Sequence, residues 1–225
     1  ERVTDFGWDQ NAQGISFAAI GNHNNQMKKG VNYGGKTNLT DSGALGATLT
    51  GTIAGIDVFV NEEDTDVDFL LMGSAAYAKE EAQALANKLI AVAEARQDAV
   101  AFISPYRGAA ITDTSEQTSA TIRNIDTITN NVLSFYSPIT SSTYGVFDSG
   151  YKYMYDRFND TFRYVPLNGD IAGTCARTDA NSFPWFSPAG SDRGAILNAV
   201  KLAYNPGKAQ RDKLYGQRIN PVITS

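Results

Sequence analysis

The pattern that most constrains the fold is a strand, a helix and a second strand that follow one another between residues 67 and 104. Val67–Met72 is a short apolar run that ends at Gly73, and Ala99–Ser104 is another that ends at Pro105. Runs of this kind are typical of buried strands. Between them, Tyr77–Arg96 carries apolar residues at the i, i+3, i+4 spacing of one helix face: Ala82, Leu85, Ala86, Leu89, Ile90 and Ala93. The unit predicts a parallel strand pair with a right-handed crossover, with Leu85, Leu89 and Ile90 packed on the strands.

The next part of the chain predicts a helix and a hairpin. The helix is expected from Ser115 to Val132, with isoleucines along one side. Tyr144–Asp156 and Thr161–Val165 flank a Phe-Asn-Asp turn, and Tyr151, Tyr153 and Tyr155 alternate with other residues at a period of two. That period predicts strands with an aromatic face.

The last third of the chain predicts one more helix and some short elements. Pro166 is expected to open a helix that contains Ile171 and Cys175, because proline suits a first helical turn. A strand near Ile196–Ala203, a helix near Ala209–Tyr215 and an extended segment, Ile219–Thr224, follow. The fold class expected is α/β: a mixed sheet with a βαβ crossover and helices packed on it, plus a tyrosine-rich hairpin.

Residues 1–60 are rich in glycine, asparagine and threonine and show no amphipathic helix. Ile15–Ile20 and Ile56–Val60 are the candidate strands in this part, and the acidic run 61–66 is expected to be a solvated loop. We expect 1–60 to be strands and loops of the same core, and 61–225 to be the α/β core domain. The first residues are neither a signal peptide nor a starting methionine, which suggests a chain cut from a longer one.

Composition narrows the classes of function. Nineteen Lys and Arg against 24 Asp and Glu give a net charge of −5, which argues against a nucleic acid or an anionic membrane as partner. One cysteine and one histidine exclude an internal disulfide, a thiolate cluster and a multi-histidine metal site. No apolar stretch approaches the roughly 18 residues that span a bilayer.

Residues Gly30–Thr37 match the phosphate-binding pattern G-x-x-x-x-G-K-[ST]. Such a loop works because it leaves a buried strand and enters a helix whose amides hold the phosphates. Here the residues before it, NHNNQMKK, cannot be a buried strand, and those after it are poor helix formers. We therefore interpret the motif as a glycine-rich loop, with an α/β nucleotide-binding enzyme as the alternative.

Other candidate residues also favour a structural interpretation. The acidic group Glu62, Glu63, Asp64, Asp66 and Asp68 could offer oxygen ligands to calcium, but it lacks the alternating ligand loop of a calcium site. His23 has no nucleophile motif near it, and Cys175 lies on the apolar side of its helix. The alternating tyrosines could stack on bases, although half-buried packing or a protein interface suits an acidic chain better. The residues alone thus predict no catalytic residue, no metal ligand and no cofactor.

A series of short motifs in the last third carries a family resemblance. In order they are YKYMYD at 151–156, VPL and DIAG within 165–173, CARTD at 175–179, WFSPAG at 185–190, and AQRDKLY with INP within 209–221. Together they closely resemble the tail sheath proteins of T-even-type contractile-tailed phages. Residues 61–104 are similar to the same family more weakly.

The resemblance implies a structural role and no enzyme activity. Subunits of this family stack as a helical sheath around a tail tube and contract to drive genome ejection through the host envelope. It implies other sheath subunits, the tube protein, and baseplate and tail terminator proteins as partners, and a place in the virion after assembly in the host cytoplasm. The sheath of a related phage-tail-like device is a further alternative. Family subunits are joined by terminal extensions that add strands to a neighbour's sheet, so this chain alone is expected to stay monomeric.

Overall fold

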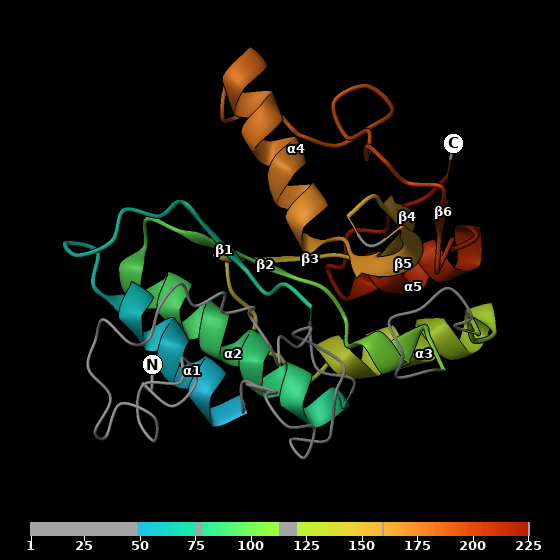
Figure 1. Cartoon of the computed structure of the whole chain (residues 1–225), viewed down its shortest axis with the longest axis horizontal. Coiled ribbons are helices and arrows are strands. Elements are labelled where there is room, and N and C mark those ends of the chain that lie inside the picture. The colour runs from blue at the N-terminus through green and yellow to red at the C-terminus, as the bar shows by residue number, and fades with distance from the viewer. Residues whose placement is uncertain (1–48, 75–77, 113–120, 159, 225) are drawn as a thin grey trace, which may run out of the picture. The chain divides into compact units, whose positions relative to one another are not determined.

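The computed structural model describes residues 49–74, 78–112, 121–158 and 160–224 (Figure 1). Ile15–Ile20, His23 and Gly30–Thr37 lie outside these residues. The helices are α1 (Leu49–Ile56), α2 (Lys79–Arg96), α3 (Ile125–Tyr136), α4 (Asn168–Asn181) and α5 (Lys208–Gly216), with 3-10 turns η3 (Asp57–Val60) and η4 (Arg107–Ala109). The strands are β1 (Phe69–Leu71), β2 (Val100–Ile103), β3 (Gly145–Phe147), β4 (Tyr151–Asp156), β5 (Thr161–Pro166) and β6 (Lys201–Leu202). The α/β fold class is confirmed.

The first sheet is parallel, in the order β1-β2-β3, and α2 connects its first two strands. Phe69 pairs with Val100 and Leu71 with Phe102, so the predicted parallel pair is confirmed. Leu85, Leu89 and Ile90 are buried, in one core cluster with apolar residues of β1 and β2, as the periodicity predicted. The helix ends at Gln97, which adopts a left-handed conformation and donates its N–H to Ala93 O.

Helices cover both faces of this sheet. α2 packs against β2, whereas the N-terminal part of α4 contacts β1 and β2 from the other side (Figure 1). α4 then extends away from the sheet, and its buried residues end at Thr178. Among the described residues, no helix combines the length and apolar character needed to cross a bilayer.

The second sheet contains the predicted hairpin, in the order β5-β4-β6. Tyr151 pairs with Pro166 and Asp156 with Thr161, all antiparallel. The predicted single run Tyr144–Asp156 is split: Gly145–Phe147 joins the parallel sheet instead. The break lies at Asp148-Ser149-Gly150, where the Asp148 carboxylate accepts the Gly150 N–H.

Some element boundaries differ from the predictions. Ile56–Val60 is not a strand but the end of α1 followed by η3, which both contact α2. The expectation that residues 1–60 contain strands and loops without a helix is therefore wrong at 49–56. The first part of the second predicted helix, 115–120, lies outside the described residues. Residues 121–124 are not helical, and α3 begins at Ile125, where Asn124 caps it by accepting the Asp126 N–H. It then continues past Val132 to Tyr136.

The strand and helix predicted in the last third are shorter or displaced. Pro166 is the last residue of β5, where a missing N–H is tolerated, and α4 starts two residues later. Only Lys201–Leu202 of the predicted strand Ile196–Ala203 pairs with β4. The helix predicted at Ala209–Tyr215 is confirmed as α5 with one more residue at each end.

Candidate functional site

The carboxyl ends of the three parallel strands are the first place to look for a site, because ligands bind there in open α/β sheets. Gly73, Ser104 and Asp148 follow β1, β2 and β3, and Asn168 begins α4 beside them. Asn168 Nδ2 donates to Gly73 O at 2.9 Å, and Gly73 N donates to Asn168 Oδ1 at 3.2 Å. Ser104 Oγ accepts from both Asn168 N and Asn168 Nδ2, and it donates to Asp148 Oδ2 at 2.6 Å.

Asp148 is the electrostatic centre of this group, which we call the strand-end network. Its carboxyl group is buried, and burial raises its pKa to about 8. The hydrogen bonds from Ser104 and Gly150 favour the ionised form and so lower the pKa, but burial has the larger effect. The Tyr136 hydroxyl donates to the main-chain oxygens of Ile103 and Asp148 at 2.9 and 2.8 Å, and burial raises its pKa as well. These groups use their hydrogen-bonding capacity on one another, so the network joins β1, β2, β3, α3 and α4.

The described residues hold no group of three or more His, Cys, Asp or Glu side chains placed to bind a metal. The acids Glu62, Glu63, Asp64, Asp66 and Asp68 are exposed on the loop before β1, as predicted. Cys175 is half-buried on α4, and burial raises the pKa of its thiol, which lowers the share of reactive thiolate.

The three alternating tyrosines have different environments. Tyr151 is buried, and its hydroxyl donates to Pro105 O at 2.9 Å. Tyr153 stacks on Phe162 with ring centroids 5.4 Å apart, and Lys201 Nζ lies 4.8 Å from the centroid of its ring. Tyr155 is exposed. Tyr151 and Tyr153 thus pack as predicted, and Lys201 covers the ring that a base would need.

A shallow hollow lies between α3 and α5. Its lining contains one lysine and no carboxylate, imidazole or thiol: Asn130, Leu133, Ser134, Ser137, Lys213 and Gln217. Such a lining offers no general acid–base pair.

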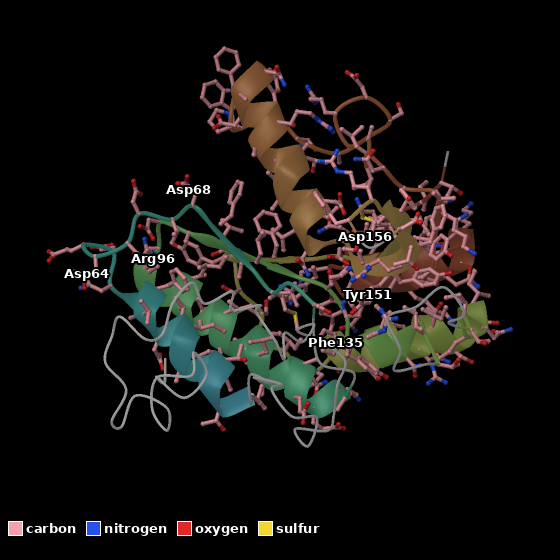
Figure 2. All side chains as sticks on the ribbon, in the orientation of Figure 1. Asp64, Asp68, Arg96, Phe135, Tyr151 and Asp156 are labelled. Carbon is pink, nitrogen blue, oxygen red and sulfur yellow. The ribbon has the colours of Figure 1, made fainter. Side chains whose placement is uncertain are left out.

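The acidic loop before β1 is held in place by a buried arginine. Arg96, at the end of α2, donates to Phe59 O at 2.9 Å and Thr65 O at 3.0 Å, and both its Nε and Nη2 donate to Asp98 at 2.8 Å. These hydrogen bonds lower the pKa of Asp98. Figure 2 shows Arg96 beside the loop that carries Asp64 and Asp68. Because the main chain of the loop is fixed from inside, its carboxylates can stay exposed in an ordered segment.

The segment after α4 is held in a similar way. Arg177 Nη2 donates to Arg193 O and Ala195 O at 2.7 and 2.8 Å, and the buried Lys152 bridges Asp170 at 2.7 Å and Leu197 O at 3.1 Å. Gly194 closes a tight turn, since a Cβ there would lie 2.7 Å from Gly190 O. Polar contacts rather than aromatic burial therefore order residues 182–200.

Comparison with known proteins identifies the family. A family profile described as the phage tail sheath protein central domain matches residues 43–225. The chain belongs to the phage tail sheath family. Three tail sheath proteins of phages are among its relatives. That of Enterobacteria phage T4 is 39% identical over 189 residues, which cover 82% of this chain and 28% of that protein.

The two other relatives give similar values. The tail sheath protein of Vibrio phage KVP40 is 38% identical over 174 residues, covering 75% of this chain and 26% of that protein. The tail sheath protein of Salmonella phage ViI is 31% identical over 175 residues, covering 76% and 25%. This sheath-family chain thus spans about a quarter of the length of the relatives it matches.

The residues that organise this sheath-family chain were not singled out by sequence reasoning. Arg96, Asp148, Lys152 and Asn168 each form contacts with partners distant in the sequence or in another element. One signal was present: Asp148 follows the apolar Val146 and Phe147 at a strand end. In an α/β sheet this position often belongs to a ligand-binding site, but here Asp148 connects neighbouring elements through hydrogen bonds.

Proposed function

We propose that this chain is the central part of a structural subunit of a contractile tail sheath, which polymerises around the tail tube and contracts to drive genome ejection. The match of the sheath central-domain profile to residues 43–225 carries the proposal. The three relatives, all named tail sheath proteins, support it.

The geometry of the described residues agrees with a structural rather than an enzymatic role. The strand-end network, where an α/β enzyme would place its site, is internally hydrogen-bonded and buried. The ordered, exposed segments 57–68 and 182–200 offer contact surfaces instead. We therefore propose a subunit that acts by assembly and not by catalysis.

The partners and location follow from this role. We propose that other sheath subunits, the tube protein, and baseplate and tail terminator proteins contact the whole subunit, with no nucleic acid or membrane as partner. Its place would be the virion tail, after assembly in the host cytoplasm. The domain division, 1–60 as part of the same core and 61–225 as the sheath core domain, also remains a proposal; α1 and η3, which pack on α2, support the shared core.

The alternative functions have less support. A nucleotide-binding enzyme would depend on Gly30–Thr37, and no relative above is named as one. The sheath of a phage-tail-like device would share the fold, and the neighbouring genes separate it from a phage sheath.

Labelling of tails tests the proposed function. Gold-conjugated antibodies raised against this chain are applied to extended and contracted tails of the phage that encodes it. We expect label along the whole sheath in both states. Label confined to the head, the baseplate or the tube would refute the sheath assignment.

A further inference from the structure

Two exposed surfaces of opposite charge are displayed by the described residues. Residues 57–68 carry six carboxylates, of which Asp57 pairs with Lys88, whereas residues 183–201 carry Arg193 and Lys201 against Asp192. Each contains a segment fixed by buried or half-buried cations: Arg96 for the first, and Lys152 and Arg177 for the second. Ordered segments lose little conformational entropy when a partner binds, which favours contact.

The first surface combines acid with exposed apolar side chains, and we call it the acidic surface. Val58, Phe59 and Val60 of η3 are 63%, 37% and 42% exposed. Glu62, Glu63, Asp64, Asp66 and Asp68 follow them directly in the chain. An interface typically has such an apolar centre with a charged rim.

The second surface combines aromatic rings with cations, and we call it the aromatic surface. Phe183 and Trp185 stack with centroids 4.7 Å apart and are 51% and 74% exposed, and Phe186 lies beside Phe183. Arg193 lies over the Phe186 ring, with Cζ 5.3 Å from the centroid. Leu197 and Val200, also exposed, continue toward Lys201. Aromatic residues and arginine are the types most enriched where binding energy concentrates.

The two surfaces lie at different places in the fold. The acidic surface precedes β1, at the end of that strand opposite to Gly73. The aromatic surface follows the far end of α4, whose first residue, Asn168, is hydrogen-bonded to Gly73. With 14 residues, α4 is about 21 Å long. Distinct complementary surfaces on one chain give head-to-tail contacts, which build open helical assemblies instead of closed dimers.

We propose that the acidic surface of one copy of this chain docks on the aromatic surface of the next copy. This inference rests on the proposed sheath function and goes further by naming the residues that meet. The occupant is a second copy because charge and apolar character are complementary between these two surfaces of one sequence. Complementary potentials fix the register and suppress wrong partners.

A charge-swap experiment on the full-length gene product tests the docking. One variant reverses the acidic surface with Glu63→Lys and Asp66→Lys, and the other reverses the aromatic surface with Arg193→Glu and Lys201→Glu. The control for the first variant, Glu81→Lys with Glu94→Lys, makes the same change of net charge as that variant, on exposed positions of α2. Tubes are counted by electron microscopy and measured by pelleting, and melting temperatures confirm that each variant folds.

For each reversed variant alone, we expect the amount of pelleted protein to fall roughly tenfold or more below that of the parent, because like charges then meet at the contact. An equimolar mixture recovers assembly, because the positive loop of one variant meets the negative aromatic surface of the other. Trp185→Ala, which changes no charge, also weakens assembly, and the α2 control does not. Parent-like assembly of either folded reversed variant, or a mixture no better than its components, overturns the docking. A parent protein that forms no tubes speaks against the proposed function itself.

Discussion

Arg96→Met removes the guanidinium that fixes the acidic surface, and the structure gives the size of its effect. Methionine keeps most of the buried stem but none of the hydrogen bonds to Phe59 O, Thr65 O and the Asp98 carboxylate. A hydrogen bond to a charged group contributes about 1.5–3 kcal/mol. The Asp98 side chain is 44% exposed, so water replaces part of what it loses.

The lost bonds are not additive, and their acceptors lie on a surface loop that water can reach. We therefore expect Arg96→Met to lower the free energy of unfolding by about 2–4 kcal/mol. For a domain of this size, about 1 kcal/mol shifts the melting temperature by about 2–4 °C, so the expected fall is about 4–16 °C.

Thermal unfolding followed by circular dichroism measures this fall, and hydrogen exchange locates it. We expect exchange to accelerate most at residues 57–68, because these lose their tie to α2. Arg157→Met, which removes an exposed arginine at the hairpin turn, is the matched control. If Arg96→Met has the same melting temperature as the control variant, and hydrogen exchange at residues 57–68 is unchanged, the arginine does not hold the loop.

Three further predictions follow from the core, the strand-end network and the N-terminal loop. Leu89→Ala is expected to lower the free energy of unfolding by about 2–5 kcal/mol, whereas Glu94→Ala, on the exposed side of α2, has little effect; equal effects in chemical denaturation would mean a wrong core face. Because burial raises the pKa of Asp148 to about 8, the folded protein keeps a proton that the unfolded chain releases above about pH 4. Stability from this group therefore falls as pH rises from about 4 to about 8, by at most about 1.4 kcal/mol per pH unit; urea titrations should lose this slope in Asp148→Asn and keep it in Asp179→Asn. For Gly30–Thr37 as a passive loop, calorimetry with magnesium and ATP or GTP should show no binding at millimolar ligand, and micromolar binding abolished by Lys36→Ala would contradict it.

The part of the fold that sequence predicted correctly depends on local periodicity. The i, i+3, i+4 spacing of Leu85, Leu89 and Ile90 reflects one buried helix face. Such a pattern is readable because burial repeats along a single element. The period of two at Tyr151–Asp156 predicted the strand β4, although burial there falls along the strand, from Tyr151 and Lys152, both buried, to the exposed Tyr155. The family resemblance rested on short motifs within residues 151–221 and is confirmed by the profile match to residues 43–225.

The part that sequence reasoning missed depends on contacts between distant residues. Gly145–Phe147 pairs with β2 and not with the hairpin, since the chain changes sheets at Asp148. Val58–Val60 is apolar like a strand, but α2 supplies the partners that fix it as a 3-10 turn, with Lys88 bonded to Asp57 and Arg96 to Phe59 O. In both cases the deciding partner lies at least 30 residues away in the sequence, where no local pattern records it.

Electron microscopy of the full-length gene product tests the central claim most directly. The proposed sheath role leads us to expect that this product polymerises into tubes without added nucleotide. We predict tubular polymers in which the domain formed by residues of this chain repeats along a helical lattice. A product that remains as single particles at every concentration and ionic strength, with or without a tail tube to assemble on, would contradict the account.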